Sequence, residues 1–259
     1  MSRYALITGA SSGIGEELAR VFAREGWNLI IVARRIDRLN DLANELTAKF
    51  NIEAIPLQSD LSDSNHVNEL YQTIIQKDIK IEVLVNNAGF GANGAFREID
   101  MQKQENMINL NILALTKLTH LLLPGMVSRG KGAVLNIAST AAFQPGPFMA
   151  VYYASKAYVL SFSEAINNEL KGTGVSCTAL CPGPTQSEFQ EKADVGDKPL
   201  FKMKTLATSK EVAEYAYKAM INKKSVAIYG LLNKIGVQLL RFTPRNIVVN
   251  IVRKLQEPK

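Results

Sequence analysis

The chain has 259 residues, of which 47% are hydrophobic and 21% are charged. This composition is typical of a globular protein and excludes disordered and collagen-like chains. An α/β domain can reach roughly 250 residues as a single unit, so we expect one domain over residues 1–259. The longest uninterrupted apolar runs fall far short of the ~18 residues that a membrane-spanning helix needs, and no such helix is expected.

The formal net charge of +6 is concentrated near the C-terminal end. Residues 222–259 hold eight Lys and Arg and one acid, a net charge of +7, whereas residues 1–221 carry a net charge of −1. The basic segment contains few aromatic residues and no nucleic-acid recognition motif. Nucleic acid is therefore not an expected partner.

Short β-rich runs alternate with stretches that have helical spacing along most of the chain. The expected strands cover residues 4–8, 29–33, 53–57, 83–86, 133–138, 175–180 and 226–229. Several are nearly continuous Val, Ile, Leu and Ala runs, which is typical of strands covered on both faces. The pattern predicts an α/β fold with one doubly wound, Rossmann-type parallel sheet of about seven strands and helices on both faces. Residues 184–206 lack periodicity and are expected to form a substrate lid.

Two features of the chain favour a cytoplasmic location. The first strand begins by residue 3 or 4, so a cleaved signal peptide of 15–30 residues would remove it. Cys177 and Cys181 fall on one expected strand, about 13 Å apart, which is too far for a disulfide. We expect both to be reduced core thiols, and we expect no metal site.

A glycine-rich turn, Thr8-Gly9-Ala10-Ser11-Ser12-Gly13-Ile14-Gly15, follows the first expected strand and precedes an amphipathic helix. Glycine permits the tight turn, close approach of a pyrophosphate and packing of the helix on its strand. The start of the helix offers free N–H groups and a positive dipole end to that anion. The turn therefore predicts dinucleotide binding by Gly9, Ser11, Ser12, Gly13, Ile14 and Gly15.

The end of the second strand indicates which dinucleotide is bound. An NAD-binding protein usually has an acid about 20 residues after the glycine turn, to bind the ribose 2′-hydroxyl. Here that place holds Ala33, followed by Arg34 and Arg35. A guanidinium can bind a 2′-phosphate, so NADP(H) is favoured over NAD(H), although Ser12 stands where many NADP-binding relatives have a basic residue.

Further motifs follow in order: Asn86-Asn87-Ala88-Gly89, Ser139, Tyr152-x-x-x-Lys156 and Pro182-Gly183-Pro184-Thr185. Together with the glycine turn they resemble the short-chain dehydrogenase/reductase family over roughly residues 3–230. The resemblance implies that Asp60 and Leu61 lie beside the adenine and Asn87, Ala88 and Gly89 beside the ribose. It also implies that Pro182, Gly183 and Thr185 lie beside the nicotinamide, and that Lys156 bonds the nicotinamide ribose.

The Tyr152-x-x-x-Lys156 spacing places both side chains on one face of a helix. A nearby ammonium and the positive charge of oxidised nicotinamide would lower the pKa of Tyr152, which could then exchange a proton with a substrate oxygen. Ser139 would hydrogen-bond the same oxygen. The resemblance implies that Asn111 positions a water in the proton relay. Tyr153 is the adjacent competitor for the acid–base role.

The expected activity is hydride transfer between nicotinamide and a carbonyl or secondary alcohol of an apolar, lipid-, steroid- or acyl-like substrate. The alternatives are an NAD-linked alcohol dehydrogenase and a non-catalytic dinucleotide-binding sensor or scaffold. Apolar residues that could face the substrate are Phe90, Phe143, Phe148, Met149, Phe189, Leu200, Phe201 and Met203.

Two surfaces are expected to meet partners. The resemblance implies a homodimer or homotetramer built on the helices that carry Asn111 and Tyr152, where apolar residues include Leu110, Ile112, Leu113, Leu115, Leu118, Val159, Leu160, Phe162 and Ile166. The basic segment 230–259 has a helical apolar stripe at positions 231, 232, 235, 239 and 242. It is expected either to pack on the domain or to form one pocket wall and also meet an anionic membrane.

Overall fold

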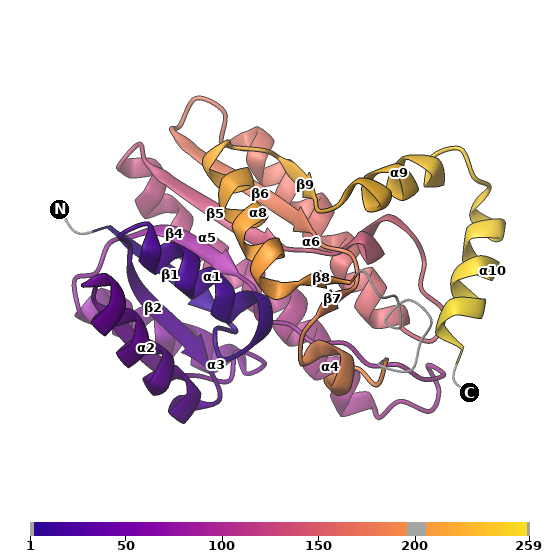
Figure 1. Cartoon of the computed structure of the whole chain (residues 1–259), viewed down its shortest axis with the longest axis horizontal. Coiled ribbons are helices and arrows are strands. Elements are labelled where there is room, and N and C mark those ends of the chain that lie inside the picture. Colours follow the sequence, from indigo (N-terminus) through magenta and orange to yellow (C-terminus); the bar gives the residue numbers. More distant parts are fainter. Residues whose placement is uncertain (1–2, 196–205, 258–259) are drawn as a thin grey trace.

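The computed structural model describes residues 3–195 and 206–257 and contains a seven-stranded sheet (Figure 1). The strands are β1 (Tyr4–Thr8), β2 (Asn28–Ala33), β3 (Ala54–Gln58), β4 (Ile81–Asn86), β5 (Gly132–Ile137), β6 (Val175–Cys181) and β9 (Val226–Ile228). Each expected strand is present, with its ends shifted by two residues or fewer. A separate parallel pair, β7 (Thr185–Gln186) and β8 (Ala207–Thr208), was not expected.

Every strand of the main sheet runs parallel, in the order β3-β2-β1-β4-β5-β6-β9. The chain begins at β1, adds β2 and β3 on one side, and then returns to place β4 on the other side. The switch in direction therefore lies between β1 and β4, where Ile7 pairs with Ile31 on one side and Val85 on the other. Ligands of open parallel sheets bind beyond the carboxyl ends of the strands at such a switch point. The predicted doubly wound fold is confirmed.

Helices cover both faces of the sheet. They are α1 (Gly13–Arg24), α2 (Ile36–Phe50), α3 (Ser64–Gln76), α4 (Met101–Ile108), α5 (Leu115–Ser128), α6 (Ala150–Glu169), α7 (Phe189–Lys192), α8 (Ser209–Ile221), α9 (Leu231–Leu240) and α10 (Arg245–Gln256). On one face, α1, α2 and α8 bury Leu18, Leu39 and Val212 in a single apolar cluster. The other face is covered by α3, α5 and α6, through residues such as Val67 and Leu118. This double cover explains why the strands are nearly continuous apolar runs.

A π-helical turn, Asn109–Ala114, joins α4 to α5, so residues 101–128 form one continuous helix. An 18-residue stretch of this helix has a mean hydropathy of 1.4, which together with the helix length would suffice to cross a membrane. No helix of this kind was expected from the sequence, because only uninterrupted apolar runs were considered and this helix is interrupted by Asn and Thr side chains. In the fold it packs on β4 and β5, with Leu115, Leu118, Leu122 and Met126 buried. Packing in the domain therefore accounts for these four apolar residues.

The same packing shows which apolar residues of these helices face the sheet. Leu115 and Leu118 on α5, and Val159 and Leu160 on α6, are buried within the described chain. These four residues stabilise the layer between the helices and the sheet, so they are not available to a partner.

Both cysteines lie on β6 and are free, buried thiols, as expected. Burial raises the pKa of Cys177 and of Cys181 to about 12. Thiols with such values remain protonated at neutral pH, so they are inert packing groups rather than nucleophiles.

The C-terminal helices α9 and α10 extend beyond β9 at one end of the molecule (Figure 1). The chain leaves β9 through Gly230, whose φ of +86° strongly favours glycine. Of the two helices, only Val237, Val248, Val252 and Gln256 are fully buried.

Candidate active site

A cavity of about 610 Å³ opens at the carboxyl ends of the strands. Almost every predicted site residue contributes to its wall. The predicted residues that line it are Gly9, Ser11, Ser12, Gly13, Ile14, Arg34, Arg35, Asp60, Leu61, Asn87, Ala88, Gly89, Ser139, Tyr152, Lys156, Pro182, Gly183 and Thr185. The two exceptions are Gly15 and Asn111.

The glycine turn leads from β1 into α1 and forms one end of the cavity. Gly9 and Gly13 have φ angles of +67° and +59°, which side-chain-bearing residues rarely adopt. A Cβ on Gly9 would lie 2.9 Å from the Ala88 Cα, so only glycine permits this approach of two loops. Residues 11–14 then meet the cavity at the start of α1. This arrangement fits the pyrophosphate of a dinucleotide, because the first N–H groups of a helix and its dipole favour an anion.

Gly15 does not touch the cavity. A Cβ at this position would lie 2.3 Å from the carbonyl oxygen of Gly9. Its function is therefore to let α1 pack against the turn, which is the packing role expected for one of the three glycines. A direct contact between Gly15 and the cofactor is not supported by this geometry.

Thr8 connects the glycine turn to the loop that follows β4. The backbone N–H groups of Asn87 and Ala88 both donate to Thr8 Oγ1, at 3.0 Å each. Asn87 Nδ2 donates to the carbonyl oxygen of Thr8 at 2.9 Å. This role of Thr8 was not predicted, although its place at the end of a strand, directly before the glycine turn, was a usable signal.

Two arginines lie beside the glycine turn, and each is paired with an acid. Arg35 Nη2 donates to the carbonyl oxygen of Ser11 at 3.1 Å and forms an ion pair with Glu188 at 2.9 Å. The Arg34 side chain is 71% exposed, and its Nη1 lies 3.7 Å from Asp60. Both guanidinium groups line the cavity, where they could bind a phosphate on the 2′-hydroxyl of the adenosine ribose.

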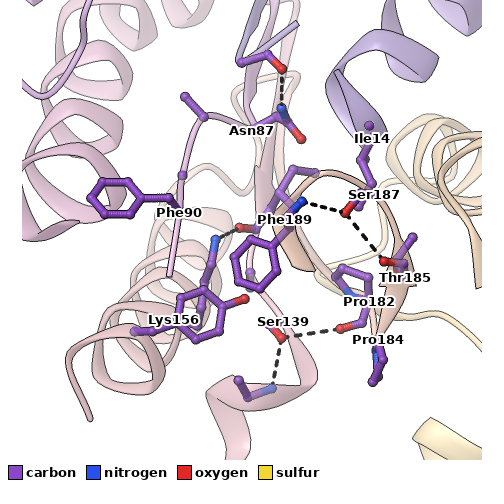
Figure 2. A pocket seen from close by; sticks show the side chains of 18 of the residues that line it. Ile14, Asn87, Phe90, Ser139, Lys156, Pro182, Pro184, Thr185, Ser187 and Phe189 are labelled. Atoms are coloured by element: carbon purple, nitrogen blue, oxygen red, sulfur yellow. Dashed lines mark hydrogen bonds between the residues drawn. The ribbon is translucent and has the colours of Figure 1, made fainter. Parts of the chain in front are cut away.

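Ser139, Tyr152 and Lys156 lie together on the cavity wall. Lys156 Nζ donates to the carbonyl oxygen of Ile137 at 2.7 Å and lies 5.8 Å from the centroid of the Tyr152 ring. Ser139 Oγ accepts a hydrogen bond from the N–H of Ala141 at 3.1 Å, which fixes the turn after β5. Figure 2 shows Ser139 and Lys156 on one side of the cavity, and Asn87 and Ile14 on the other.

Residues 3–197 match the family model described as short chain dehydrogenase. The chain belongs to this family. Sulfoacetaldehyde reductase 2 of Chromohalobacter salexigens is 36% identical over 84% of this chain and 88% of its own length. Among solved structures, a short-chain dehydrogenase from Sphingobium yanoikuyae in complex with NADPH has a TM-score of 0.82 at 31% identity, covering 94% of this chain and 97% of that one. A bulky-bulky ketone specific alcohol dehydrogenase from Comamonas testosteroni has a TM-score of 0.79 at 31% identity, covering 93% and 92%. The expected oxidoreductase family is confirmed.

The electrostatics of the catalytic group in this short-chain dehydrogenase differ from the expectation. Burial raises the pKa of Tyr152, and the hydrogen bond with Ser139 acts in the opposite direction. The sequence argument predicts a lowered value, but it relies partly on the charge of oxidised nicotinamide, which the chain does not supply. In the chain alone Tyr152 is a protonated phenol at neutral pH.

Burial also lowers the pKa of Lys156, to about 8. A lysine in an unfolded chain titrates near 10.4, so between pH 8 and 10 the unfolded chain holds a proton that the native chain releases. Lys156 should therefore make the native state more stable as pH rises through this window, by up to about 1.4 kcal/mol per pH unit. We expect the difference in free energy of unfolding between wild type and Lys156→Met to grow in favour of wild type from pH 7.5 to 9.5. Urea denaturation monitored by circular dichroism would measure it.

The difference between wild type and Lys156→Met cancels the contributions of other titrating groups to the free energy of unfolding. The raised pKa of Cys177 lowers stability above about pH 9, and it does so equally in both proteins because Lys156 does not act on this thiol. Lys171→Met, at an exposed lysine outside the cavity wall, supplies the control. Parallel curves for wild type and Lys156→Met would contradict the prediction.

Asn111 is held in the π-helical turn behind the cavity wall. Its Oδ1 accepts from the N–H of Phe90 at 3.1 Å, while its Nδ2 donates to the carbonyl oxygen of Phe90 and to Ser155 Oγ, both at 3.0 Å. The side chain thus fixes the loop after β4 against the helix that carries Tyr152. Its role in positioning a water stays a prediction.

The C-terminal helices close the cavity opposite the sheet. Their lining residues are Leu232, Asn233, Gly236, Val237, Leu240, Leu255 and Gln256. Gln256 Nε2 donates to the Tyr153 hydroxyl at 3.1 Å, and Asn93 Nδ2 donates to the carbonyl oxygen of Gln256 at 3.0 Å. The segment therefore forms the expected wall, and Tyr153 is already engaged by α10. Sequence periodicity could indicate the helices but not these anchoring contacts.

Three of the apolar residues expected near the substrate line the cavity, namely Phe90, Met149 and Phe189. The Phe189 ring lies against that of Tyr152, with centroids 5.2 Å apart. Phe143 instead packs in the core, and Phe148 lies under the Arg253 guanidinium. The remaining candidates, Leu200, Phe201 and Met203, lie outside the described residues.

Proposed function

We propose that this protein transfers hydride between NADP(H) and a carbonyl or secondary alcohol of a bulky apolar substrate. The observation that carries the proposal is the arrangement of one cavity. A phosphate-binding glycine turn and two arginines lie at one end, and Ser139, Tyr152 and Lys156 lie where the reacting carbon would be placed.

The residues present fit the cofactor. The turn at residues 9–14 would hold its pyrophosphate, Asp60 and Leu61 its adenine, and Asn87 and Lys156 the nicotinamide ribose. When bound, NADPH supplies the hydride, and the chain supplies orientation and the proton.

Ser139 would donate a hydrogen bond to the carbonyl oxygen and orient it toward Tyr152. Because burial keeps Tyr152 protonated, its phenol can give a proton to that oxygen as negative charge develops there. Lys156, near the Tyr152 ring, would stabilise the resulting phenolate through its charge. These roles favour reduction of a carbonyl in the cofactor-bound state.

Preference for NADP(H) over NAD(H) is supported by the site and by relatives. Ala33 stands where an acid would repel a 2′-phosphate, and Arg34 and Arg35 both face the cavity. A relative 31% identical in sequence was solved with NADPH.

The substrate class follows from the lining of the other end. Met149, Phe189, Leu232, Val237 and Leu240 make this part of the wall apolar. Among the described lining residues, the cations are Arg34, Arg35 and Lys156, and the arginines lie beside the glycine turn. Among the described lining residues, the apolar end of the cavity therefore has no arginine or lysine to bind a substrate sulfonate. A bulky ketone fits this apolar wall better than sulfoacetaldehyde does.

A panel of carbonyls tests the proposal, with NADPH oxidation followed at 340 nm and saturating cofactor. The panel should contain aryl ketones, steroid ketones, 3-oxoacyl thioesters and sulfoacetaldehyde. We expect the highest kcat/KM for bulky apolar ketones. Faster turnover of sulfoacetaldehyde would overturn the substrate class, and no turnover of any carbonyl would overturn the proposed activity.

We also propose a homo-oligomer formed through α4, α5 and α6. On this face Ile108, Leu113 and Tyr158 are 37–41% exposed, and Tyr158 stacks on Phe162 with ring centroids 5.7 Å apart. Large side chains held rigidly in this way are typical of interface anchors. Light scattering at micromolar concentration should show an oligomer that Leu113→Asp weakens. A wild-type protein that is entirely monomeric would contradict this.

A further inference from the structure

The helices α9 and α10 present large apolar side chains to solvent. Of the fifteen exposed large hydrophobic residues in the described chain, seven lie between positions 231 and 251. They are Leu231, Leu232, Ile235, Leu239, Phe242, Ile247 and Ile251, and we refer to them as the apolar tail surface. Phe242 is 84% exposed and Leu232 is 77% exposed. Such a concentration within 21 residues indicates a surface that meets another apolar phase.

Packing on the domain does not account for this surface. On α9 the positions that face the body are Asn233, Val237 and Leu240. Leu231, Ile235 and Leu239 are spaced four residues apart, and this spacing places them together on a different, exposed side of the helix. A helix that only packed on the domain would turn its most apolar face inward. The apolar tail surface is therefore left without a partner by the described fold.

The charges around the apolar tail surface are almost all positive. Lys234, Arg241, Arg245, Arg253 and Lys254 are exposed on these two helices or the link between them. Glu257 is the acid of the described tail, and it pairs with Arg253 at 3.4 Å. Apolar side chains with a basic border are complementary to a bilayer that has anionic headgroups over hydrocarbon.

A second copy of the chain suits this surface less well. Symmetric dimers place the same patch of both copies face to face, which would bring the five cations of one copy against those of the other. Such like-charge contact opposes association. An anionic lipid surface offers the opposite sign to the same residues.

The apolar tail surface also lies at the mouth of the substrate cavity. Leu232 belongs to both, because it is mostly exposed and also lines the cavity. From there Val237 and Leu240 continue the apolar wall inward. Figure 1 shows α9 and α10 at one end of the molecule, beyond β9.

We propose that the protein docks on anionic lipid bilayers through the apolar tail surface, with the mouth of the cavity facing the lipid. The docking itself follows from α9 and α10 alone. That an apolar substrate enters from the bilayer rests in addition on the proposed function.

Co-sedimentation of the full chain with vesicles tests the docking. Vesicles of phosphatidylcholine with phosphatidylglycerol are compared with vesicles of phosphatidylcholine alone, at low and high salt. We expect binding to the anionic vesicles that weakens with salt, and little binding to the neutral ones. Each basic residue near such a surface contributes roughly 1 kcal/mol, so Lys234→Gln with Arg241→Gln should weaken binding about 30-fold.

A second variant tests the apolar contribution. Leu239→Ser with Phe242→Ser should also release the protein from anionic vesicles, and neither residue lines the cavity. The matched control is Ile75→Ser with Phe96→Ser, which removes two exposed apolar side chains elsewhere and should bind as wild type does. Absence of binding to anionic vesicles at low salt would overturn the proposal. So would concentration-dependent self-association that is lost in the Leu239→Ser, Phe242→Ser variant, because a second copy would then cover the surface.

Turnover of a water-soluble ketone without vesicles keeps the two proposals separate. Both tail variants should retain the wild-type kcat in that assay, because the substituted residues lie outside the site. Loss of vesicle binding with normal turnover then concerns docking alone. Normal vesicle binding with no turnover of any ketone would instead refute the proposed function.

Discussion

Tyr152→Phe is expected to lower kcat by about 10²- to 10⁴-fold while the Kd for NADPH stays close to the wild-type value. The substitution removes one hydroxyl group, and with it the proton that a substrate oxygen would receive. The ring itself remains, so its contacts with Phe189 and Lys156 are kept. Steady-state NADPH oxidation measures kcat, and titration calorimetry measures Kd.

Tyr153→Phe is the matched control for this experiment. Its hydroxyl accepts from Gln256, and its ring is buried against Gly146 and α10. Removal of this hydroxyl should cost some stability of the C-terminal helices and little kcat. If Tyr152→Phe kept most of its activity and Tyr153→Phe lost it, the acid–base role would belong to Tyr153.

Wild type should bind NADPH more tightly than NADH, and Arg34→Ala should remove most of the difference. A hydrogen bond between charged groups contributes about 1.5–3 kcal/mol, which corresponds to a loss of roughly 10- to 150-fold in NADPH affinity. Arg34 is mostly exposed and only loosely paired with Asp60, so its guanidinium can turn to a 2′-phosphate at small cost. Affinity for NADH, which lacks that phosphate, should change little. Equal affinities of wild type for both cofactors would refute the cofactor assignment.

Substitution of Glu188 should change NADPH affinity in the opposite direction to substitution of Arg34. Its carboxylate pairs with Arg35 at 2.9 Å, so it would lie near the negative charge of a phosphate bound there. Glu188→Gln should therefore strengthen NADPH binding severalfold and leave NADH binding unchanged. Glu191→Gln, on the exposed side of the same short helix, is the control. Weaker NADPH binding by Glu188→Gln would show that the carboxylate orients Arg35 rather than competing for it.

The sheet was predictable because parallel strands that are covered by helices on both faces have short, continuous apolar sequences. Leu29–Ala33, for example, can be recognised from its own sequence alone. The cofactor end was predictable for a related reason. Its residues follow directly after strands, so one topological rule brings Gly9, Asp60 and Asn87 to the same edge.

What could not be predicted depends on contacts between segments far apart in the chain. The burial that raises the pKa of Tyr152 is supplied by surrounding elements, whereas the sequence indicated only its neighbour Lys156. Helical spacing placed the apolar residues Leu118 and Leu160 on helices. It did not show whether their side chains face the sheet or a second copy of the chain. The π-helical turn at Asn111 similarly has no periodic signature.

The two ends of the cavity come from separate parts of the chain, and this division makes the protein modular. The glycine turn, Ser139, Tyr152 and Lys156 lie within residues 3–197, the stretch that the family model matches, whereas the opposite wall of the cavity lies within residues 231–256. Relatives could exchange this second stretch, and with it their choice of substrate, while they keep the same redox chemistry. For enzyme engineering, α9 and α10 form an exchangeable unit. Its polar anchors are Gln256 on Tyr153 and Asn93, and its apolar anchors are the buried Val237, Val248 and Val252. A graft that retained these anchors could acquire a new specificity without any change in the cofactor site.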